Sequence, residues 1–359
     1  MNKEKLQLNN KKILINGAAG FIGSSLAKKL RKEVSNAHII GIDCLTDYNP
    51  ISLKEYRLKE IESINSTSDW KFIKGDIGDK EFVDFVFRTY KPSFVVNLAA
   101  QAGVRYSIDH PNTYVHSNLI GFYNILEACR HSYEQYEGGV EHLIYASSSS
   151  VYGGNKKVPF STDDRVDNPV SLYAATKKSN ELMAHAYSKL YNIPSTGLRF
   201  FTVYGPAGRT DMFYFSATTR LVDNKDIEIF NYGNCKRDFT YIDDIVEGVY
   251  LVMQGAPKRK VGEDGLPIPP YAIYNIGGGT SENLLDYIDT LQNELIRAKV
   301  LPKDYDFESH KKLVPMQAGD VPVTYADSKP LEKDYGFKPS IGIKEGLRNF
   351  AEWYKEYYK

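Results

Sequence analysis

Tyr173 and Lys177 are candidates for proton transfer, because a phenol beside an ammonium can act as a base. They lie four residues apart in Ser171-Leu-Tyr-Ala-Ala-Thr-Lys177, so on a helix they share one face, about one turn apart. A free phenol has a pKa near about 10 and is a poor base at neutral pH. A neighbouring ammonium favours the phenolate and lowers that pKa toward the working range. Because the chain contains 27 Tyr, the alternative for this pair alone is an ordinary contact on a helix surface, and the surrounding elements must decide.

A glycine-rich turn near the start of the chain predicts a dinucleotide site. Residues 12–16 form an apolar run, Gly17-Ala-Ala-Gly-Phe-Ile-Gly23 follows, and residues 24–31 have a helical pattern. This order points backbone N–H groups and a helix N-terminus at a pyrophosphate. The next predicted strand, residues 38–42, ends in Asp43, twenty residues after the last glycine. A carboxylate there accepts hydrogen bonds from ribose hydroxyls and repels a 2′-phosphate, which favours NAD over NADP.

Further strand and helix patterns alternate through the first half of the chain. Predicted strands cover residues 70–74, 93–98 and 141–146, and predicted helices cover residues 81–90 and 113–131. This alternation predicts an α/β fold with a Rossmann-like, doubly wound parallel sheet. Asp76, the Ala99-Ala100-Gln101 turn and the serines after Ala146 each follow a strand directly. They should therefore ring one crevice at the carboxyl ends of the strands.

Composition narrows the functional class. Hydrophobic residues make up 42% and charged residues 25% of the 359, and Lys+Arg and Asp+Glu both count 45. This balance gives no basic footprint for nucleic acid or an anionic membrane. Residues 1–10 are polar, unlike a signal peptide, and no apolar run reaches the ~20 residues of a membrane span. Cys44, Cys129 and Cys235 are widely separated, which predicts reduced thiols in a cytoplasmic protein, and no histidine spacing predicts a metal site.

Several motifs, read together and in order, resemble one superfamily. They are Gly17-Ala-Ala-Gly-Phe-Ile-Gly23, Asn97-Leu-Ala-Ala100, Ser147-Ser-Ser-Ser-Val-Tyr-Gly153, Tyr173-Ala-Ala-Thr-Lys177, Leu198-Arg-Phe-Phe-Thr-Val-Tyr-Gly-Pro206 and Arg237-Asp-Phe-Thr-Tyr-Ile-Asp-Asp244. The chain thus resembles the extended short-chain dehydrogenases/reductases, among them the sugar-nucleotide epimerases and dehydratases. Within these it is most similar to the UDP-glucuronate 4-epimerases, through Ala100-Gln-Ala-Gly-Val-Arg-Tyr-Ser107, residues 169–206 and Met316-Gln-Ala-Gly-Asp-Val-Pro322.

The resemblance implies a reaction and roles for three catalytic residues. Tyr173 is expected to take the proton from the sugar 4-hydroxyl while NAD+ accepts the C4 hydride. Lys177 is expected to activate Tyr173 and to bind the nicotinamide ribose, and Ser148 to share a hydrogen bond with the sugar 4-oxygen. The 4-keto sugar then turns and takes the hydride back on its other face, which interconverts UDP-glucuronate and UDP-galacturonate.

The resemblance also implies two sets of binding residues. The NAD site is expected at Gly17, Gly20, Phe21, Ile22, Gly23, Asp43, Asp76, Ile77, Leu98, Ala99, Ala100, Asn118, Tyr173, Lys177 and Phe200. The UDP-sugar site is expected at Arg105, Ser148, Ser149, Thr202, Arg209, Met212, Arg237, Gln317 and Asp320. Within the second set, Arg237, Gln317 and Asp320 are expected to meet the diphosphate and ribose.

The residues before Val151-Tyr-Gly bear on related reactions. The similar 4,6-dehydratases carry an Asp-Glu pair there and the decarboxylases a Glu, whereas this chain has Ser149 and Ser150. Hydroxyls cannot supply the acid and base for elimination. To keep its carbon dioxide, a 4-keto uronate must have its carboxylate held near the ring plane. Thr202 and Ser149 are candidate holders, and Arg105 and Arg209 are candidate cations, the alternative for each Arg being a surface ion pair.

Three other functions stay open at this stage. The first is an epimerase of neutral UDP-hexoses, the second a UDP-glucuronate decarboxylase, and the third a sensor that binds NAD without catalysis. Intact Tyr173, Lys177 and Ser148 argue against the sensor, because binding alone does not need them.

The second half of the chain is expected to build a smaller, mixed α/β sugar-nucleotide domain. The predicted division assigns residues 1–199 and 240–278 to the NAD-binding domain, and 200–239 and 279–359 to the UDP-sugar domain. Residues 227–233 alternate like a strand, and residues 257–270 have the composition of a loop. Asp243 and Asp244 are expected to cap a helix over residues 245–253. The resemblance implies a homodimer formed through helices 113–131 and 171–191.

Overall fold

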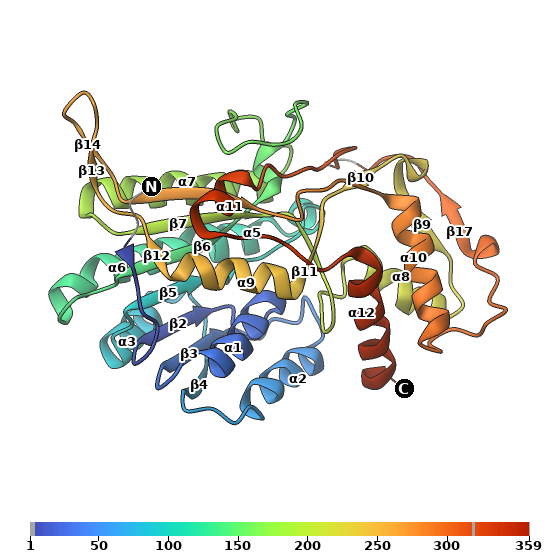
Figure 1. Cartoon of the computed structure of the whole chain (residues 1–359), viewed down its shortest axis with the longest axis horizontal. Coiled ribbons are helices and arrows are strands. Elements are labelled where there is room, and N and C mark those ends of the chain that lie inside the picture. The colour runs from blue at the N-terminus through green and yellow to red at the C-terminus, as the bar shows by residue number, and fades with distance from the viewer. Residues whose placement is uncertain (1–3, 318–319, 359) are drawn as a thin grey trace.

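A seven-stranded parallel sheet organises the computed structural model, which describes residues 4–317 and 320–358 (Figure 1). Its strands, in spatial order, are β4 (Asp69–Lys74), β3 (His38–Asp43), β2 (Lys12–Asn16), β5 (Phe94–Asn97), β6 (His142–Ser148), β7 (Ser195–Phe200) and β15 (Tyr271–Ile276). The chain builds outward from β2 to β4, then returns to β5 and builds in the other direction. The point where the order reverses, between β2 and β5, is where open α/β sheets bind ligands. The predicted fold class is confirmed.

The strands alternate their side chains between two hydrophobic cores. In β2, Ile13 and Ile15 belong to one core, while Leu14 belongs to the other. Such strands, buried on both faces, are typical of a parallel sheet covered by helices. Helices α1 (Phe21–Glu33) and α9 (Ile242–Met253) contribute to the first core, and α3 (Lys80–Tyr90), α6 (Gly121–Gln135) and α7 (Leu172–Tyr191) to the second.

The helical run before β6 is not uniform. It begins with α5 (Pro111–Tyr114), passes through a π-helix (Val115–Ile120) and continues as α6. The sequence predicted one helix over residues 113–131, and it did not predict the π-helical segment. π-Helical segments are rare and frequent at functional sites, and this one carries Asn118.

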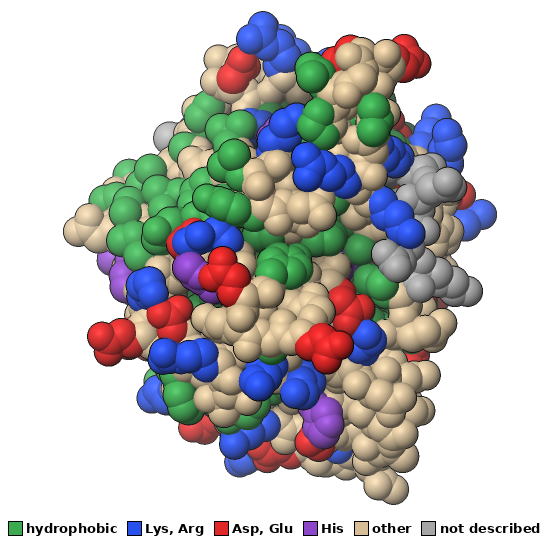
Figure 2. Space-filling view, turned by 90° about the vertical axis from the view of Figure 1, so that its left-hand side faces the viewer, with side chains coloured by type: hydrophobic (Ala, Val, Ile, Leu, Met, Phe, Trp, Pro, Cys, Tyr) green, Lys and Arg blue, Asp and Glu red, His purple; other side chains and the backbone are tan. Residues whose placement is uncertain are grey.

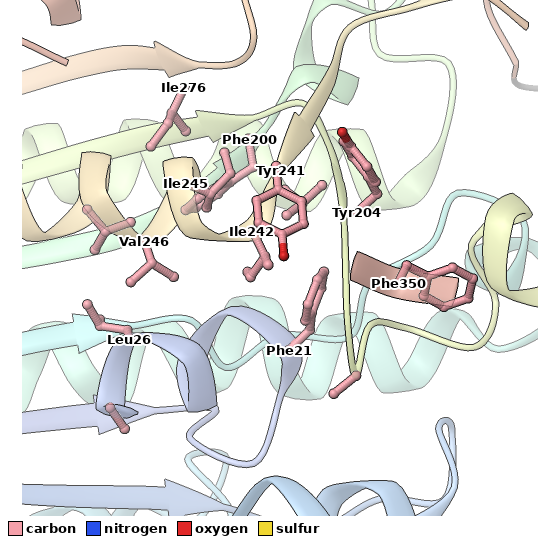
Figure 3. Packing of buried hydrophobic residues seen from close by; sticks show 14 of the residues in the cluster. Phe21, Leu26, Phe200, Tyr204, Tyr241, Ile242, Ile245, Val246, Ile276 and Phe350 are labelled. Atoms are coloured by element: carbon pink, nitrogen blue, oxygen red, sulfur yellow. The ribbon is translucent and has the colours of Figure 1, made fainter. Parts of the chain in front are cut away.

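A smaller α/β unit stands beside the sheet. It contains α8 (Phe213–Val222), α10 (Leu284–Arg297), α12 (Ile343–Tyr358) and the parallel pair of β9 (Ile227–Ile229) and β17 (Lys311–Leu313), to the right in Figure 1. The core runs into it without a break, since Phe350 of α12 belongs to the same cluster as Phe21 and Leu26 of α1 (Figure 3). The predicted strand over residues 227–233 is wrong beyond Ile229, because Asn231 and Tyr232 adopt φ angles of 52° and 53°, which end an extended strand.

Asp243 and Asp244 lie inside the first turn of α9 (Ile242–Met253), so the prediction that they cap a helix over residues 245–253 is wrong. Helix α9 already begins at Ile242, and its first residue follows Tyr241 without a side-chain cap. The Asp244 carboxylate instead accepts hydrogen bonds from Ser340 N at 2.9 Å and Ile341 N at 3.0 Å. It therefore ties the segment before α12 to helix α9, a contact between residues almost a hundred positions apart.

The remaining predictions concern connecting segments. Residues 257–270 are not only loop, because β13 (Lys260–Val261) and β14 (Pro267–Ile268) pair there as a short hairpin.

In residues 4–317 and 320–358, the helices lack the combination of length and apolar character that a bilayer crossing needs. The same residues bring together no group of three or more His, Cys, Asp or Glu side chains that could hold a metal ion.

Candidate active site

One cavity of about 1030 Å³ collects the predicted site residues at the carboxyl edge of the sheet. From the predicted cofactor set it is lined by Gly17, Gly20, Phe21, Ile22, Gly23, Asp43, Asp76, Ile77, Leu98, Ala99, Ala100, Tyr173, Lys177 and Phe200. From the predicted substrate set it is lined by Arg105, Ser148, Ser149, Thr202, Arg209, Met212, Arg237, Gln317 and Asp320.

Asn118 is the one predicted residue that lies behind the cavity wall. Its side-chain amide donates to the Gln101 carbonyl at 3.0 Å and to Thr176 Oγ1 at 3.0 Å, and its oxygen accepts from Gln101 N at 2.8 Å. It thus links the turn after β5 to helix α7, one residue before Lys177.

The glycine turn leaves bare backbone facing the cavity. Gly17 has a φ of +81°, and a Cβ there would lie 2.7 Å from Ala99 N. A Cβ on Gly23 would lie 2.2 Å from the Gly17 carbonyl oxygen. Only glycine fits both positions, and the turn leads directly into the N-terminus of the 13-residue helix α1. The arrangement suits an anion with oxygens to accept N–H groups.

Asp43 and Asp76 stand at the ends of β3 and β4. The Asp43 carboxylate accepts from Ala19 N at 3.2 Å and Leu45 N at 2.8 Å, and the ammonium of Lys54 lies 3.5 Å away. Asp76 lies 3.0 Å from Nε2 of His116 in the π-helix. Asp43 is thus fixed against the glycine turn, as a residue that selects ribose hydroxyls must be.

Tyr173 and Ser148 are hydrogen-bonded to each other in the cavity. Burial raises the pKa of Tyr173 above its usual range, and hydrogen bonding to Ser148 and the charge of Arg209 partly offset this. Ser148 ends β6, and its hydroxyl also accepts from Ser150 N at 3.1 Å. A phenol and an alcohol in contact can pass one proton between them and a substrate hydroxyl.

Lys177 lies one turn along α7 from Tyr173 but is engaged elsewhere. Its ammonium donates to the Ala146 carbonyl at 2.9 Å, and burial lowers its pKa to about 8. The sequence predicted that this ammonium lowers the pKa of Tyr173. In the structure, Arg209 is the cation that favours the phenolate.

A buried ion pair supports the serine strand from behind. The Glu181 carboxylate accepts from Arg199 Nε at 2.8 Å and Ser147 Oγ at 2.7 Å. Arg199 also donates to the Tyr152 hydroxyl at 2.9 Å. One turn beyond Lys177 on α7, Glu181 therefore sets the register between the helix that carries Tyr173 and the strand that carries Ser148.

Arg209 is the cation whose charge acts on Tyr173. Its guanidinium grips Asp211 in two-point fashion, Nε to Oδ1 at 3.0 Å and Nη2 to Oδ2 at 2.6 Å. Burial opposes the charge on Arg209, but Asp211 outweighs this and raises the pKa further. The Tyr48 hydroxyl donates to the same carboxylate at 3.0 Å. The side chain of Arg209 is still 28% exposed, which leaves a cationic edge facing the cavity.

The far end of the cavity carries the remaining predicted residues. The guanidinium of Arg105 lies over the Phe230 ring at 4.7 Å, and Arg237 pairs with Asp320 at 2.8 Å. The side-chain oxygen of Gln317 is buried and has no hydrogen-bond partner among the residues that the structure describes. A buried acceptor without a partner favours a ligand donor.

The residues that form this cavity lie largely in a segment that matches a known protein family. Residues 13–277 match the NAD dependent epimerase/dehydratase family, a span that includes the glycine turn, the serine run and the Tyr173–Lys177 pair. The chain belongs to this family.

Similar family members span nearly the whole chain. Protein CapI of Staphylococcus aureus is 49% identical over 354 residues, covering 97% of this chain and 99% of that protein. UDP-glucuronate 4-epimerase 4 of Arabidopsis thaliana is 41% identical over 353 residues, covering 96% of this chain and 76% of that protein. The crystal structure of a UDP-glucuronic acid 4-epimerase from Bacillus cereus, in complex with UDP-glucuronic acid and NAD, superposes with a TM-score of 0.81 at 31% identity. The superposition covers 97% of this chain and 100% of the Bacillus cereus chain.

Sequence reasoning missed several cavity residues of this epimerase/dehydratase chain. Tyr48, Asn49, Arg57 and Asp211 line the cavity but belong to none of the quoted family motifs. Only Asp211 carried a usable signal, because a carboxylate two residues after Arg209 in a loop can pair with it. The others become visible only when distant segments are brought together.

Proposed function

We propose that this protein is an NAD-dependent UDP-glucuronate 4-epimerase that interconverts UDP-glucuronate and UDP-galacturonate. The observation that carries the proposal is one cavity that joins Tyr173 and Ser148 to the cation Arg209, with the neutral Ser149 alongside. The family, and relatives that bear this enzyme's name, support the same conclusion.

The glycine turn fits a dinucleotide, since a Cβ on Gly17 or Gly23 would strike backbone atoms. NAD would be held by the bare backbone of this turn at its pyrophosphate and by Asp43 at a ribose. Lys177 and Tyr173 would hold the nicotinamide end. When bound, NAD supplies the hydride acceptor and donor for C4 of the sugar, and in its oxidised form a positive charge that favours the Tyr173 phenolate.

Tyr173 and Ser148 handle the proton. The Tyr173 oxygen takes the proton of the 4-hydroxyl, with the Ser148 hydroxyl donating to the same sugar oxygen, and returns it when C4 has changed configuration. Because the hydride removed from C4 is returned to C4, no net oxidation occurs, and because the same groups take and return the proton, no external acid is needed.

Arg209 holds the 4-keto uronate in a position that allows epimerisation and prevents decarboxylation. A 4-keto uronate is a β-keto acid, which loses carbon dioxide when its carboxylate stands perpendicular to the ketone. Arg209 would hold the carboxylate near the ring plane through charge-assisted hydrogen bonds, with the hydroxyls of Thr202 and Ser149 as further donors.

The nucleotide part of the substrate belongs at the far end of the cavity. Arg237, Gln317 and Asp320 would contact the diphosphate and ribose, and Arg105 and Met212 would complete the site. A planar guanidinium matches phosphate oxygens in two-point fashion.

We infer that NAD and the UDP-sugar are bound by two different domains. Residues 1–199 and 240–278 form the NAD-binding domain, and residues 200–239 and 279–359 the UDP-sugar domain. The pairing of β15 with β7 supports the return of the chain to the first domain after residue 240.

A homodimer and a cytoplasmic location complete the proposal. Exposed apolar side chains on α6 and α7 and beside them, Ile120, Tyr123, Leu182 and Leu190, support a dimer through these helices. Figure 2 shows hydrophobic side chains gathered on the end of the molecule that lies to the left in Figure 1. The free thiols of Cys44, Cys129 and Cys235 support a reducing compartment.

The test is an assay of the purified protein with UDP-glucuronate and, separately, UDP-glucose, followed by NMR. Formation of UDP-galacturonate, with turnover of UDP-glucose at least about tenfold slower, is expected from the charge of Arg209. Faster epimerisation of UDP-glucose would overturn the assignment of the substrate. Absence of both reactions in protein that binds NAD would favour a sensor.

A further inference from the structure

We propose that Arg57 is a positioning residue that couples the dinucleotide turn to the loop that carries Arg209, and so sets the preference for an acidic sugar. The inference rests on the proposed function. Arg57 lies on α2 (Ile51–Glu62) and is only 2% exposed.

The hydrogen bonds of Arg57 reach two segments that are far apart in sequence. One guanidinium nitrogen, Nη1, donates to the Ala19 carbonyl at 3.0 Å, inside the glycine turn. The other two donate to the loop before Arg209, Nε to the Ala207 carbonyl at 2.9 Å and Nη2 to the Gly208 carbonyl at 2.8 Å. A single planar group therefore spans the gap between the two loops, which the point charge of a lysine cannot do.

Two neighbours of Arg57 hold the same loop further along. The side-chain oxygen of Asn49 accepts from Thr210 N at 2.9 Å and from Thr210 Oγ1 at 3.0 Å. The Tyr48 hydroxyl donates to Asp211, which grips Arg209. Residues 207, 208, 210 and 211 are thus each fixed by a side chain from residues 48–57.

The free-energy cost of burying the Arg57 guanidinium indicates that this side chain has a role beyond packing. Burial lowers the pKa of Arg57 to about 10, and its three hydrogen bonds, to Ala207, Ala19 and Gly208, go to backbone carbonyls. Burying a cation in this way is expensive compared with an apolar side chain. What the guanidinium provides is a fixed distance between the turn for the cofactor and the loop for the substrate carboxylate.

The test compares Arg57→Lys with wild-type protein loaded with NAD. Calorimetry gives the dissociation constants of UDP-glucuronate and UDP-glucose, and the NAD content is measured after denaturation. We expect Arg57→Lys to retain NAD and to lower the preference for UDP-glucuronate over UDP-glucose by about tenfold, because the acidic group alone meets Arg209. A merely structural role would lower thermal stability and weaken both sugars alike, leaving the ratio unchanged.

Arg31→Lys is the matched control. Arg31 also donates from its guanidinium to a backbone carbonyl, that of Ile64 at 2.6 Å, but it does not line the cavity. Its variant should keep the wild-type ratio.

A milder variant covers failure of Arg57→Lys to fold. Tyr48, Asn49 and Arg57 together form a brace that holds the loop of residues 207–211. Tyr48→Phe removes one hydroxyl from this brace and should lower the preference for UDP-glucuronate over UDP-glucose by about threefold. An unchanged ratio in every folded brace variant overturns the role of Arg57 while leaving the proposed function intact. A wild-type protein that turns over neither sugar, or that binds both equally, overturns both.

Discussion

The ammonium of Lys177 lies 2.9 Å from the carbonyl oxygen of Ala146, two residues before Ser148. The lysine is thereby tied to β6, the strand that ends in Ser148. Burial raises the pKa of Tyr173, and the charge of Arg209 opposes this. In the proposed mechanism, the positive charge of oxidised NAD would lower the pKa of Tyr173 further.

Tyr173 should determine how the rate depends on pH. Because its pKa is raised, the phenolate fraction grows through the neutral and alkaline range, so kcat for UDP-glucuronate should rise from pH 6 to pH 9. Tyr173→Phe should lower kcat by about 10³-fold or more while NAD content stays unchanged. Steady-state rates across this range check both. A variant that keeps wild-type turnover would remove Tyr173 from the mechanism.

Lys177 should cost the protein stability. Its pKa is about 8 in the folded state and about 10.4 in the unfolded chain, so between these values the unfolded chain binds more protons. The penalty is fully present below pH 8 and fades as the pH rises toward about 10. Lys177→Met should raise the free energy of unfolding by roughly 1–3 kcal/mol at pH 7, although the variant loses activity.

Denaturant titrations at pH 7 and pH 10 measure this effect. The control is Lys189→Met, since Lys189 lies on the same helix and donates to the Pro267 carbonyl from an exposed position. Its substitution should change stability by less than about 0.5 kcal/mol. A loss of stability in Lys177→Met at pH 7 would contradict the account.

Gly17→Ala should damage the cofactor site selectively. The new Cβ would meet Ala99 N at 2.7 Å on a backbone with φ of +81°, which costs roughly 1–3 kcal/mol in strain alone. We expect lower thermal stability and loss of most bound NAD. Gly154→Ala is the control, because a Cβ there meets nothing within 4 Å. Equal NAD retention in the two variants would be inconsistent with a close approach of this backbone to the cofactor.

The Glu181–Arg199 pair offers a test of the support behind Ser148. Glu181→Leu leaves the Arg199 guanidinium, 2% exposed, without its carboxylate, which should cost about 3–5 kcal/mol. Adding Arg199→Met to this variant should recover part of the loss, since no charge then remains buried. Chemical denaturation of both variants measures the difference. A double variant less stable than Glu181→Leu would argue against a buried, unpaired charge as the cause.

Local features of the chain were predictable from the sequence, and contacts between distant segments were not. The apolar runs of the parallel strands, the glycine turn and Asp43 carry their signal within a few residues. The brace of Tyr48, Asn49 and Arg57 lies on a segment without a motif, and its partners lie 150 or more positions away or inside the glycine turn. Asp244 was assigned to its own helix because helix caps are local, while its actual partners are 96 and 97 residues away.

In the proposed mechanism, Tyr173 and Ser148 invert C4 while the uronate keeps its carboxylate. One NMR measurement tests it most directly: incubation of purified protein with UDP-glucuronate in heavy water. UDP-galacturonate should form with its carboxylate retained and no deuterium at C4, because the hydrogen that leaves C4 never exchanges with water. A pentose nucleotide with carbon dioxide, or deuterium at C4, would contradict it.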